Sequence, residues 1–315
     1  MEKDSIILHI NSRDRSENLD INNQYSTSWF KYFFKQPIVN NIGDEFQLSL
    51  HSSIIPYSFY NIRAGINDEI GILIYDPLTG TQINATTLTL SPGSYTAGAL
   101  ITELELVLSG LKGLGYMNDT ISVGFNRQTQ KFKFVTVVSS DNNKIAFFFG
   151  LSTHSAFIET GFRSDETTSK MTNTGTSITS SNVVDVNGSV HSIFIRTSLT
   201  STAQLDSGSG GFTTILGRIP IETNFGSVLF FNPTNSTHSV KIHGDTIQNI
   251  SIKLTDDNNR ILDLNGLNFT LSLEFIRIRT NRNPVEIPRY FPPPLMDTLE
   301  EDNKTKKKKK KKTKK

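Results

Sequence analysis

Residues 268–280, NFTLSLEFIRIRT, decide the fold, because apolar and polar side chains alternate along almost the whole stretch. Successive side chains of a β-strand point to opposite faces, so Phe269, Leu271 and Leu273 would share one face. A second stretch, FQLSLHSSII at residues 46–55, alternates in the same way. Both stretches therefore predict strands that bury one face in a core.

The same criterion, applied outward from these two strands, marks six more. They are Ser5–Ile10, Val190–Thr197, Thr214–Ile219, Ser227–Asn232, Ser239–His243 and Ile247–Leu254. Eight antiparallel strands in two packed sheets is the number found in a jelly roll. The chain is therefore predicted to be mainly β, an antiparallel jelly-roll sandwich, with residues 17–44 irregular.

Residues 66–165 have a different pattern, which predicts a small ββαββ insertion domain. Thr96 precedes apolar residues at helical spacing and could cap a helix from Thr96 to Leu108. The predicted strands of this domain are Ile70–Tyr75, Ile83–Leu90, Thr120–Phe125 and Lys131–Val138, and Ile145–Leu151 is a last apolar run.

The chain is predicted to have six parts. A Ser/Thr-rich stretch predicts a linker, and three consecutive prolines, Pro292–Pro294, predict an extended arm. The parts are residues 1–65 (jelly-roll N-terminal part), 66–165 (insertion domain), 166–182 (linker), 183–280 (jelly-roll C-terminal part), 281–303 (Pro-rich arm) and 304–315 (disordered poly-Lys tail).

The sequence predicts no catalytic, cofactor or metal site, and hence a protein that is not an enzyme. The absence of cysteine excludes disulfide scaffolds, thiolate zinc sites and cysteine nucleophiles. No histidine pair has a metal-binding spacing, and no Gly-x-Ser-x-Gly elbow occurs. The nearest approach to a catalytic cluster, His243-Gly244-Asp245, lies at a strand end and is interpreted as a turn.

Aromatic residues could instead form a platform on which nucleic-acid bases stack. The alternating positions of Phe132 and Phe134, and of Phe269 and Phe275, favour a core. No apolar run is long enough for a signal peptide or a membrane span.

Charge is distributed unevenly along the chain. The last twelve residues hold ten of the 32 basic side chains, which leaves 22 basic and 30 acidic side chains, about −8, on residues 1–303. A flexible cationic tail can bind nucleic acid without reading its sequence, or can serve as a solubilising or nuclear-import segment. The acidic body favours a structural protein whose tail alone contacts a genome. The candidate residues are Lys304, Lys306, Lys307, Lys308, Lys309, Lys310, Lys311, Lys312, Lys314 and Lys315.

Several motifs resemble, in their order along residues 5–280, the penton or minor capsid proteins of virophages, Polinton-like viruses and large nucleocytoplasmic double-stranded DNA viruses. These motifs are INSRDR at 10–15, SIIPYSFYNI at 53–62, LSPGSYT at 90–96 with Leu100-Ile101, FGL at 149–151, IKLTD at 252–256 and LDLNGLNF at 262–269. The lysine tail is not a feature of this group as a whole.

The resemblance implies a structural capsid protein found in the virion and assembled in the host cytoplasm, in the viral factory. It implies a homopentamer at the fivefold vertex, beside trimers of a major capsid protein, with no cofactor and no catalytic residue. The poly-Lys tail could then contact viral DNA. We expect subunit contacts from an aromatic stretch and from the Pro-rich arm, through Trp29, Phe30, Phe33, Phe34, Tyr290 and Phe291.

Two other functions fit a β-sandwich. A receptor- or glycan-binding appendage on a viral surface would display its ligand site on the insertion domain. An enzyme or nucleic-acid-binding factor would need a cluster of titratable side chains, which the sequence does not show.

Overall fold

A computed structural model describes residues 3–279 of the chain, with short gaps. The gaps are residues 21–24, 26, 40–43, 77, 115–119, 138–143, 172–174, 187–189, 200–203, 207–210, 234–238 and 243–245. Met1–Arg279 forms one compact unit, and residues 280–315 lie outside the described residues.

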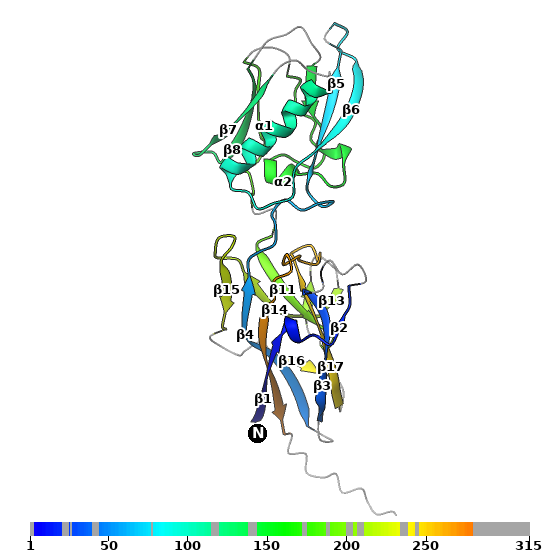
Figure 1. Cartoon of the computed structure of the whole chain (residues 1–315), viewed down its shortest axis with the longest axis vertical. Coiled ribbons are helices and arrows are strands. Elements are labelled where there is room, and N and C mark those ends of the chain that lie inside the picture. The colour runs from blue at the N-terminus through cyan, green and yellow to red at the C-terminus, as the bar shows by residue number, and fades with distance from the viewer. Residues whose placement is uncertain are drawn as a thin grey trace, which may run out of the picture. The chain divides into compact units, whose positions relative to one another are not determined.

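The first sheet is built around β18 (Thr270–Ile278), the strand predicted from residues 268–280. It pairs antiparallel with β1 (Lys3–Asn11) on one side and with β4 (Glu45–Pro56) on the other. Two short strands, β15 (Val228–Phe231) and β16 (Val240–Ile242), both pair with the far edge of β4. The sheet therefore has four positions across its width (Figure 1).

The second sheet has the order β14-β11-β17-β3-β2 and is also antiparallel. Its strands are β14 (Ile215–Pro220), β11 (Ser192–Thr197), β17 (Thr246–Thr255), β3 (Trp29–Val39) and the two-residue β2 (Glu17–Asn18). A β12 (Gln204–Asp206) and β13 (Gly211–Thr213) hairpin precedes β14.

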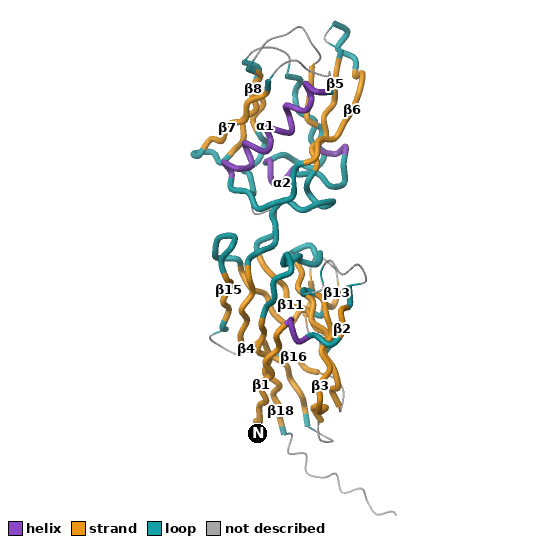
Figure 2. Tube along the Cα trace, viewed as in Figure 1, coloured by secondary structure: helices purple, strands orange, loops and turns teal. Residues whose placement is uncertain are grey.

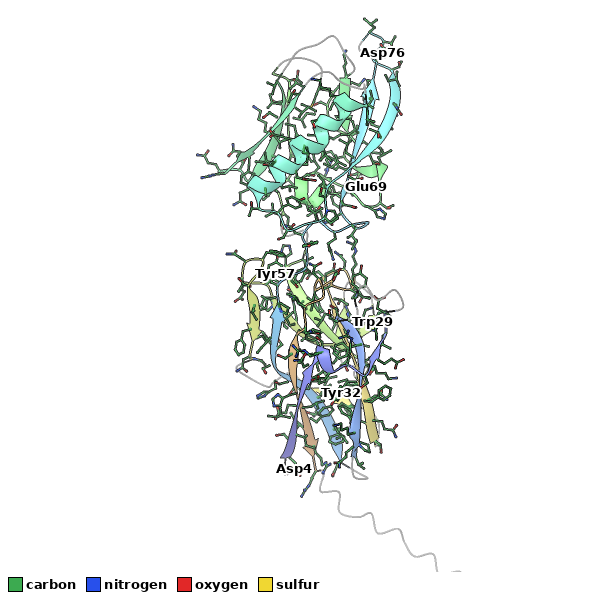
Figure 3. All side chains as sticks on the ribbon, viewed as in Figure 1. Asp4, Trp29, Tyr32, Tyr57, Glu69 and Asp76 are labelled. Atoms are coloured by element: carbon green, nitrogen blue, oxygen red, sulfur yellow. The ribbon has the colours of Figure 1, made fainter. Side chains whose placement is uncertain are left out.

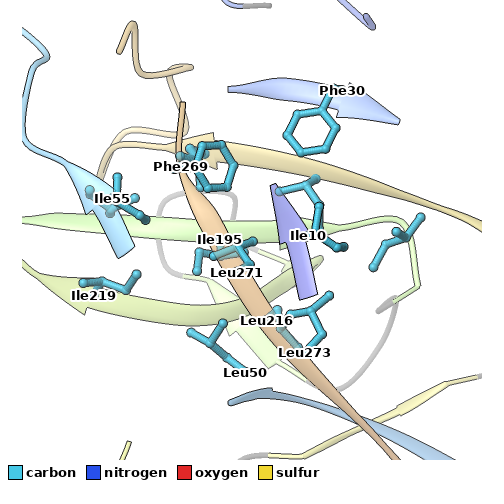
Figure 4. Close-up of a cluster of buried hydrophobic side chains, with 14 of the residues drawn as sticks. Ile10, Phe30, Leu50, Ile55, Ile195, Leu216, Ile219, Phe269, Leu271 and Leu273 are labelled. Atoms are coloured by element: carbon cyan, nitrogen blue, oxygen red, sulfur yellow. The ribbon is translucent and has the colours of Figure 1, made fainter. Parts of the chain in front are cut away.

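The jelly-roll core lies between these two sheets, where apolar side chains from both converge (Figure 4). Phe30 of the second sheet packs against Phe269, which immediately precedes β18, and their ring centroids lie 5.9 Å apart. Ile195 and Leu273 are fully buried. Each such side chain contributes about 1.5–3 kcal/mol relative to its exposed form, so the alternation of the strands is what holds the sandwich together.

The prediction of a jelly roll is confirmed, although two strand assignments behind it were wrong. Residues 17–44 are not irregular, because they contain β2 and the eleven-residue β3. The segments Ser227–Asn232 and Ser239–His243 were counted as two sheet positions, but β15 and β16 share one position beside β4. One strand was missed and one sheet position was counted twice, so the total of eight is unchanged. Each sheet has four strand positions when the two-residue β2 is left out.

The insertion between β4 and β11 has its own hydrophobic core. One sheet has the order β6-β5-β9 and another has the order β10-β8-β7, so the predicted strands divide into two sheets. Helix α1 (Ala97–Gly113) packs Leu100, Leu104, Leu108 and Leu111 into this core, and the Thr96 side chain accepts a hydrogen bond from the Ala99 N–H at the start of the helix. Figure 2 shows that α1 and α2 (Phe157–Thr160) both belong to the insertion. The strands are β5 (Glu69–Tyr75), β6 (Gln82–Thr89), β7 (Ile121–Asn126), β8 (Lys131–Thr136), β9 (Lys144–Phe147) and β10 (Ser177–Thr179).

Residues 166–182 do not form the predicted linker. Met171 and Ile178 are buried in the core of the insertion, and β10 adds a strand beside β8. Thr168 accepts a hydrogen bond from the Phe147 N–H through its hydroxyl. A Ser/Thr-rich segment can therefore pack against a sheet when a few apolar residues at the right positions anchor it. The six domain boundaries themselves stay a prediction.

Candidate interaction surfaces

The described residues hold no group of three or more His, Cys, Asp or Glu side chains that could bind a metal ion. His243-Gly244-Asp245 lies outside the described residues. Phe132, Phe134 and Phe275 are buried, as the core interpretation predicted. No helix among the described residues is long and apolar enough to cross a membrane.

A buried polar network holds the start of the insertion in place. Arg63 forms an ion pair at 3.0 Å with Asp256, whose side chain is fully buried. Asn67 donates a hydrogen bond at 2.6 Å to Glu159 of α2, and its own side-chain oxygen accepts from the Arg63 N–H. The ion pair and the Asn67–Glu159 bond join side chains, and the third bond holds the Arg63 backbone, so the network ties residues 63–67 to Asp256 and to α2.

Two hollows among the described residues are each smaller than usual ligand pockets of about 300–1,000 Å³. The first has a volume of about 270 Å³ and lies on the insertion; the second has a volume of about 150 Å³. Phe157, Ile158, Gly161, Phe162, Arg163, Ser164, Asn182 and Val183 line the first. Tyr25, Phe59, Tyr60, Arg63, Ala64, Ile66, Pro92, Ile261, Asp263 and Asn265 line the second.

The predicted contact residues of the aromatic stretch lie on β3 and point to both of its faces. Phe30 is 0 % exposed and belongs to the jelly-roll core, so it has no surface to offer another subunit. Phe34 is half-buried and packs against Phe275 at 6.5 Å between ring centroids. Trp29 (labelled in Figure 3) and Phe33 lie on the outer face, where Phe33 is 45 % exposed. Tyr290, Phe291 and the ten tail lysines lie outside the described residues.

Trp29 and Phe33 belong to a larger surface, which we call the cationic face. The register places Lys253 opposite Trp29, and Arg196 opposite Lys253, on the outer side of the second sheet. Arg218 lies opposite Phe194 in the same way. The cationic face comprises Trp29, Lys31, Phe33, Phe194, Arg196, Arg218 and Lys253.

Cations and aromatic rings of this face contact one another directly. The Lys253 ammonium lies 5.0 Å from the Trp29 ring centroid, and the Lys31 ammonium lies 5.1 Å from that of Phe33. The Arg218 guanidinium carbon lies 5.7 Å from the Phe194 ring centroid. Burial, and then the positive charge of Arg196, lower the pKa of Lys253. The face therefore concentrates positive charge on an acidic body.

The outer side of the first sheet, which we call the acidic-apolar face, has a different character. Phe230 of β15 is 68 % exposed and lies opposite Ile54 of β4, which is 45 % exposed. Glu274 of β18 lies on the same side, opposite Ile7 and Ser49. The acidic-apolar face comprises Ile7, Glu45, Ile54, Val228, Phe230 and Glu274, and Lys241 of β16 lies among them beside Glu45.

Sequence reasoning missed both faces apart from Trp29 and Phe33. Alternation along 249–255 does mark Asn249, Ser251 and Lys253 as outward, because their neighbours are apolar. Alternation cannot show that Lys253 lies beside Trp29 or that Arg218 lies beside Phe194, because that depends on which strands pair and in which register.

The strand order, with its insertion between β4 and β11, defines a single antiparallel jelly roll. Among solved structures, this chain is similar to selenomethionine-labelled mavirus penton protein, with a TM-score of 0.50 and 16% sequence identity. The match covers 87% of this chain and 100% of that chain, and at this identity it shows a shared fold. No protein-family model matches the sequence, and no curated protein matches it.

Proposed function

We propose that this chain is a structural capsid protein that forms the fivefold vertex of an icosahedral virus shell. In this proposal it assembles as a homopentamer and packs against trimers of a major capsid protein. The observation that carries the proposal is the jelly roll with a large insertion, which it shares with the mavirus penton protein over 87% of its length.

The surfaces of the jelly roll support this role. A cyclic oligomer is built from heterologous contacts, in which each subunit presents one surface to each neighbour. The cationic face and the acidic-apolar face are two such surfaces, and both expose aromatic side chains. The Pro-rich arm of residues 281–303, with Tyr290 and Phe291, would add contacts to neighbours. The ten tail lysines would contact the packaged genome.

The oligomeric state of the purified full-length protein tests this proposal. Native mass spectrometry and negative-stain microscopy should find rings of five copies. A stable monomer at concentrations up to about 50 µM, well above the range in which specific assemblies usually form, would contradict the vertex role.

A surface appendage that binds a receptor or glycan is the second candidate function. The hollow of about 270 Å³ on the insertion favours it, since Phe157, Arg163 and Asn182 there offer an aromatic ring and polar groups. A glycan array separates the two functions. Binding that Asn182→Ala abolishes, by a protein that does not form rings, would support the appendage.

A further inference from the structure

We propose that the cationic face of one subunit docks on the acidic-apolar face of the next copy of this chain around the ring. This inference rests on the proposed function and deepens it, because it names the two surfaces that a homopentamer would join. The partner is a second copy of the chain, and the argument for it comes from charge, exposed apolar area and sheet geometry.

Charge complementarity is the first argument. Among the described residues, Lys31, Arg218 and Lys253 form no ion pair with a carboxylate. Within the described strands, the register places a single acidic side chain beside them, Glu17 opposite Lys31. Arg196 lies beside Lys253 but is only 8 % exposed and donates hydrogen bonds to the Thr213 and Thr255 hydroxyls, so the cations that the face presents are Lys31, Arg218 and Lys253. A carboxylate from a second copy would pair with these three cations, and residues 1–303 of that copy carry about −8.

The acidic-apolar face supplies carboxylates and apolar area together. Glu274 lies on the outer side of the first sheet and accepts a hydrogen bond from Ser49 at 3.4 Å. Glu45 lies on the same side, where Lys241 pairs with it at 3.0 Å. Phe230, at 68 % exposed, is the kind of aromatic side chain that the centre of an interface buries.

The geometry of a sandwich allows one subunit to use both faces at once. The two sheets pack through their inner sides, so their outer sides point away from each other. Each subunit can then meet one neighbour through the cationic face and the other neighbour through the acidic-apolar face. This is a heterologous arrangement, which forms a closed ring when the rotation from one subunit to the next divides a full turn.

Nucleic acid fits the cationic face less well than a second copy does. Base stacking needs an open aromatic ring face, whereas Trp29, Phe33 and Phe194 each lie against a cation of the same subunit. These capped rings offer edges and apolar area instead, which suit contact with Phe230 and Ile54. Guanidinium and aromatic groups are also the side chains that protein interfaces favour.

Charge reversal with rescue tests the pairing in the full-length protein. We expect Lys31→Glu/Arg218→Glu to raise the dissociation concentration of the ring at least about 30-fold, because like charges would then face each other. Adding Glu45→Lys/Glu274→Lys to that variant should restore the ring. The matched control is Arg127→Glu/Lys133→Glu, which makes the same charge change on exposed residues of the insertion. The readout is the pentamer fraction by mass photometry across protein concentrations.

The remaining outcomes each decide the question. The pairing of the faces is overturned if rings persist in Lys31→Glu/Arg218→Glu. It is also overturned if the variant with all four substitutions fails to form rings. A ringless wild-type protein overturns the proposed function instead. Lower affinity for duplex DNA with an intact ring would assign the cationic face to nucleic acid. Phe230→Ser changes no charge and should also weaken the ring. This variant still tests the proposal if the charge-reversal variant does not fold.

Discussion

Glu159 of α2 is a buried carboxyl group. It is 2 % exposed, and desolvation raises the pKa of its carboxyl to about 7, against the smaller opposing effect of the Asn67 hydrogen bond. Below about pH 4.5 the carboxyl is protonated in both the folded and the unfolded chain. Between about pH 4.5 and 7 the folded chain binds more protons, so its stability falls as the pH rises.

The substitution Glu159→Gln should remove this pH dependence, because a neutral amide keeps an acceptor for Asn67. Relative to wild type, the variant should gain roughly 2–3 kcal/mol of unfolding free energy between pH 5 and pH 8. Denaturant unfolding of both proteins at the two pH values measures this difference. A constant difference at all pH values would show that Glu159 titrates in its ordinary range.

Asp256 neutralises the buried Arg63, and it also accepts hydrogen bonds from the N–H groups of Asn258 and Arg260. The substitution Asp256→Ala should therefore cost about 3–5 kcal/mol, since it leaves a buried cation without a partner. Arg63→Met/Asp256→Asn should cost less than Asp256→Ala alone. Chemical denaturation of the three proteins decides this, and a double variant less stable than the single one would contradict it.

Strand β5 shows how one element depends on the absence of a side chain. A Cβ added at Gly71 would lie 2.1 Å from the Phe148 carbonyl oxygen and 2.6 Å from the Leu151 Cβ. Strand β5 is central in its sheet, between β6 and β9, so it cannot move away without breaking one of the two pairings. Glycine at this position is therefore required by a close approach of backbone.

The substitution Gly71→Ala should destabilise the insertion by about 1–3 kcal/mol or more, as overpacking in a core does. Gly124→Ala in β7 is the control, because the nearest atom to its added Cβ is 3.9 Å away. Hydrogen exchange should accelerate in β5, β6 and β9 and stay unchanged in β4 and β18. Equal exchange in both variants would argue against the close approach.

Elements with one clear apolar face could be predicted from the sequence. Helix α1 was predicted from Thr96 and its leucine spacing, and β18 from its alternation. Strand β3 was missed because the outward Trp29 and Phe33 are as apolar as the inward Phe30, which hides the two-residue period. That hidden period is itself a consequence of the aromatic outer face.

Strands β15 and β16 illustrate what sequence patterns leave out. Each of them could be predicted as a strand on its own. Their shared sheet position follows only from the fact that both pair with β4. The candidate faces have the same origin, since β3, β11, β14 and β17 contribute to one of them from distant parts of the chain. Local patterns were therefore enough to predict the fold. The surfaces could not be predicted, because they depend on which strands pair with one another.

At the scale of the whole molecule, charge is divided between an acidic chain and a cationic end. About −8 on residues 1–303 repels DNA, whereas the ten lysines of residues 304–315 attract it. Lysines that neutralise phosphates release counterions, and they do so without reading base edges. If the tail acts in this way, DNA affinity should depend on the tail and on salt, but not on DNA sequence.

Deleting residues 304–315 should leave ring formation intact, because these residues lie outside the compact unit Met1–Arg279. Affinity for duplex DNA at about 50 mM salt should fall by at least a hundredfold, since each neutralised phosphate contributes about 0.9 to the slope of log K against log salt. A chain with serine in place of all ten lysines controls for tail length and should behave like the deletion. Fluorescence anisotropy over a salt series supplies both numbers. Unchanged affinity and slope in the deletion would instead make the tail a solubilising or targeting segment, and would leave the cationic face as the surface to test for DNA.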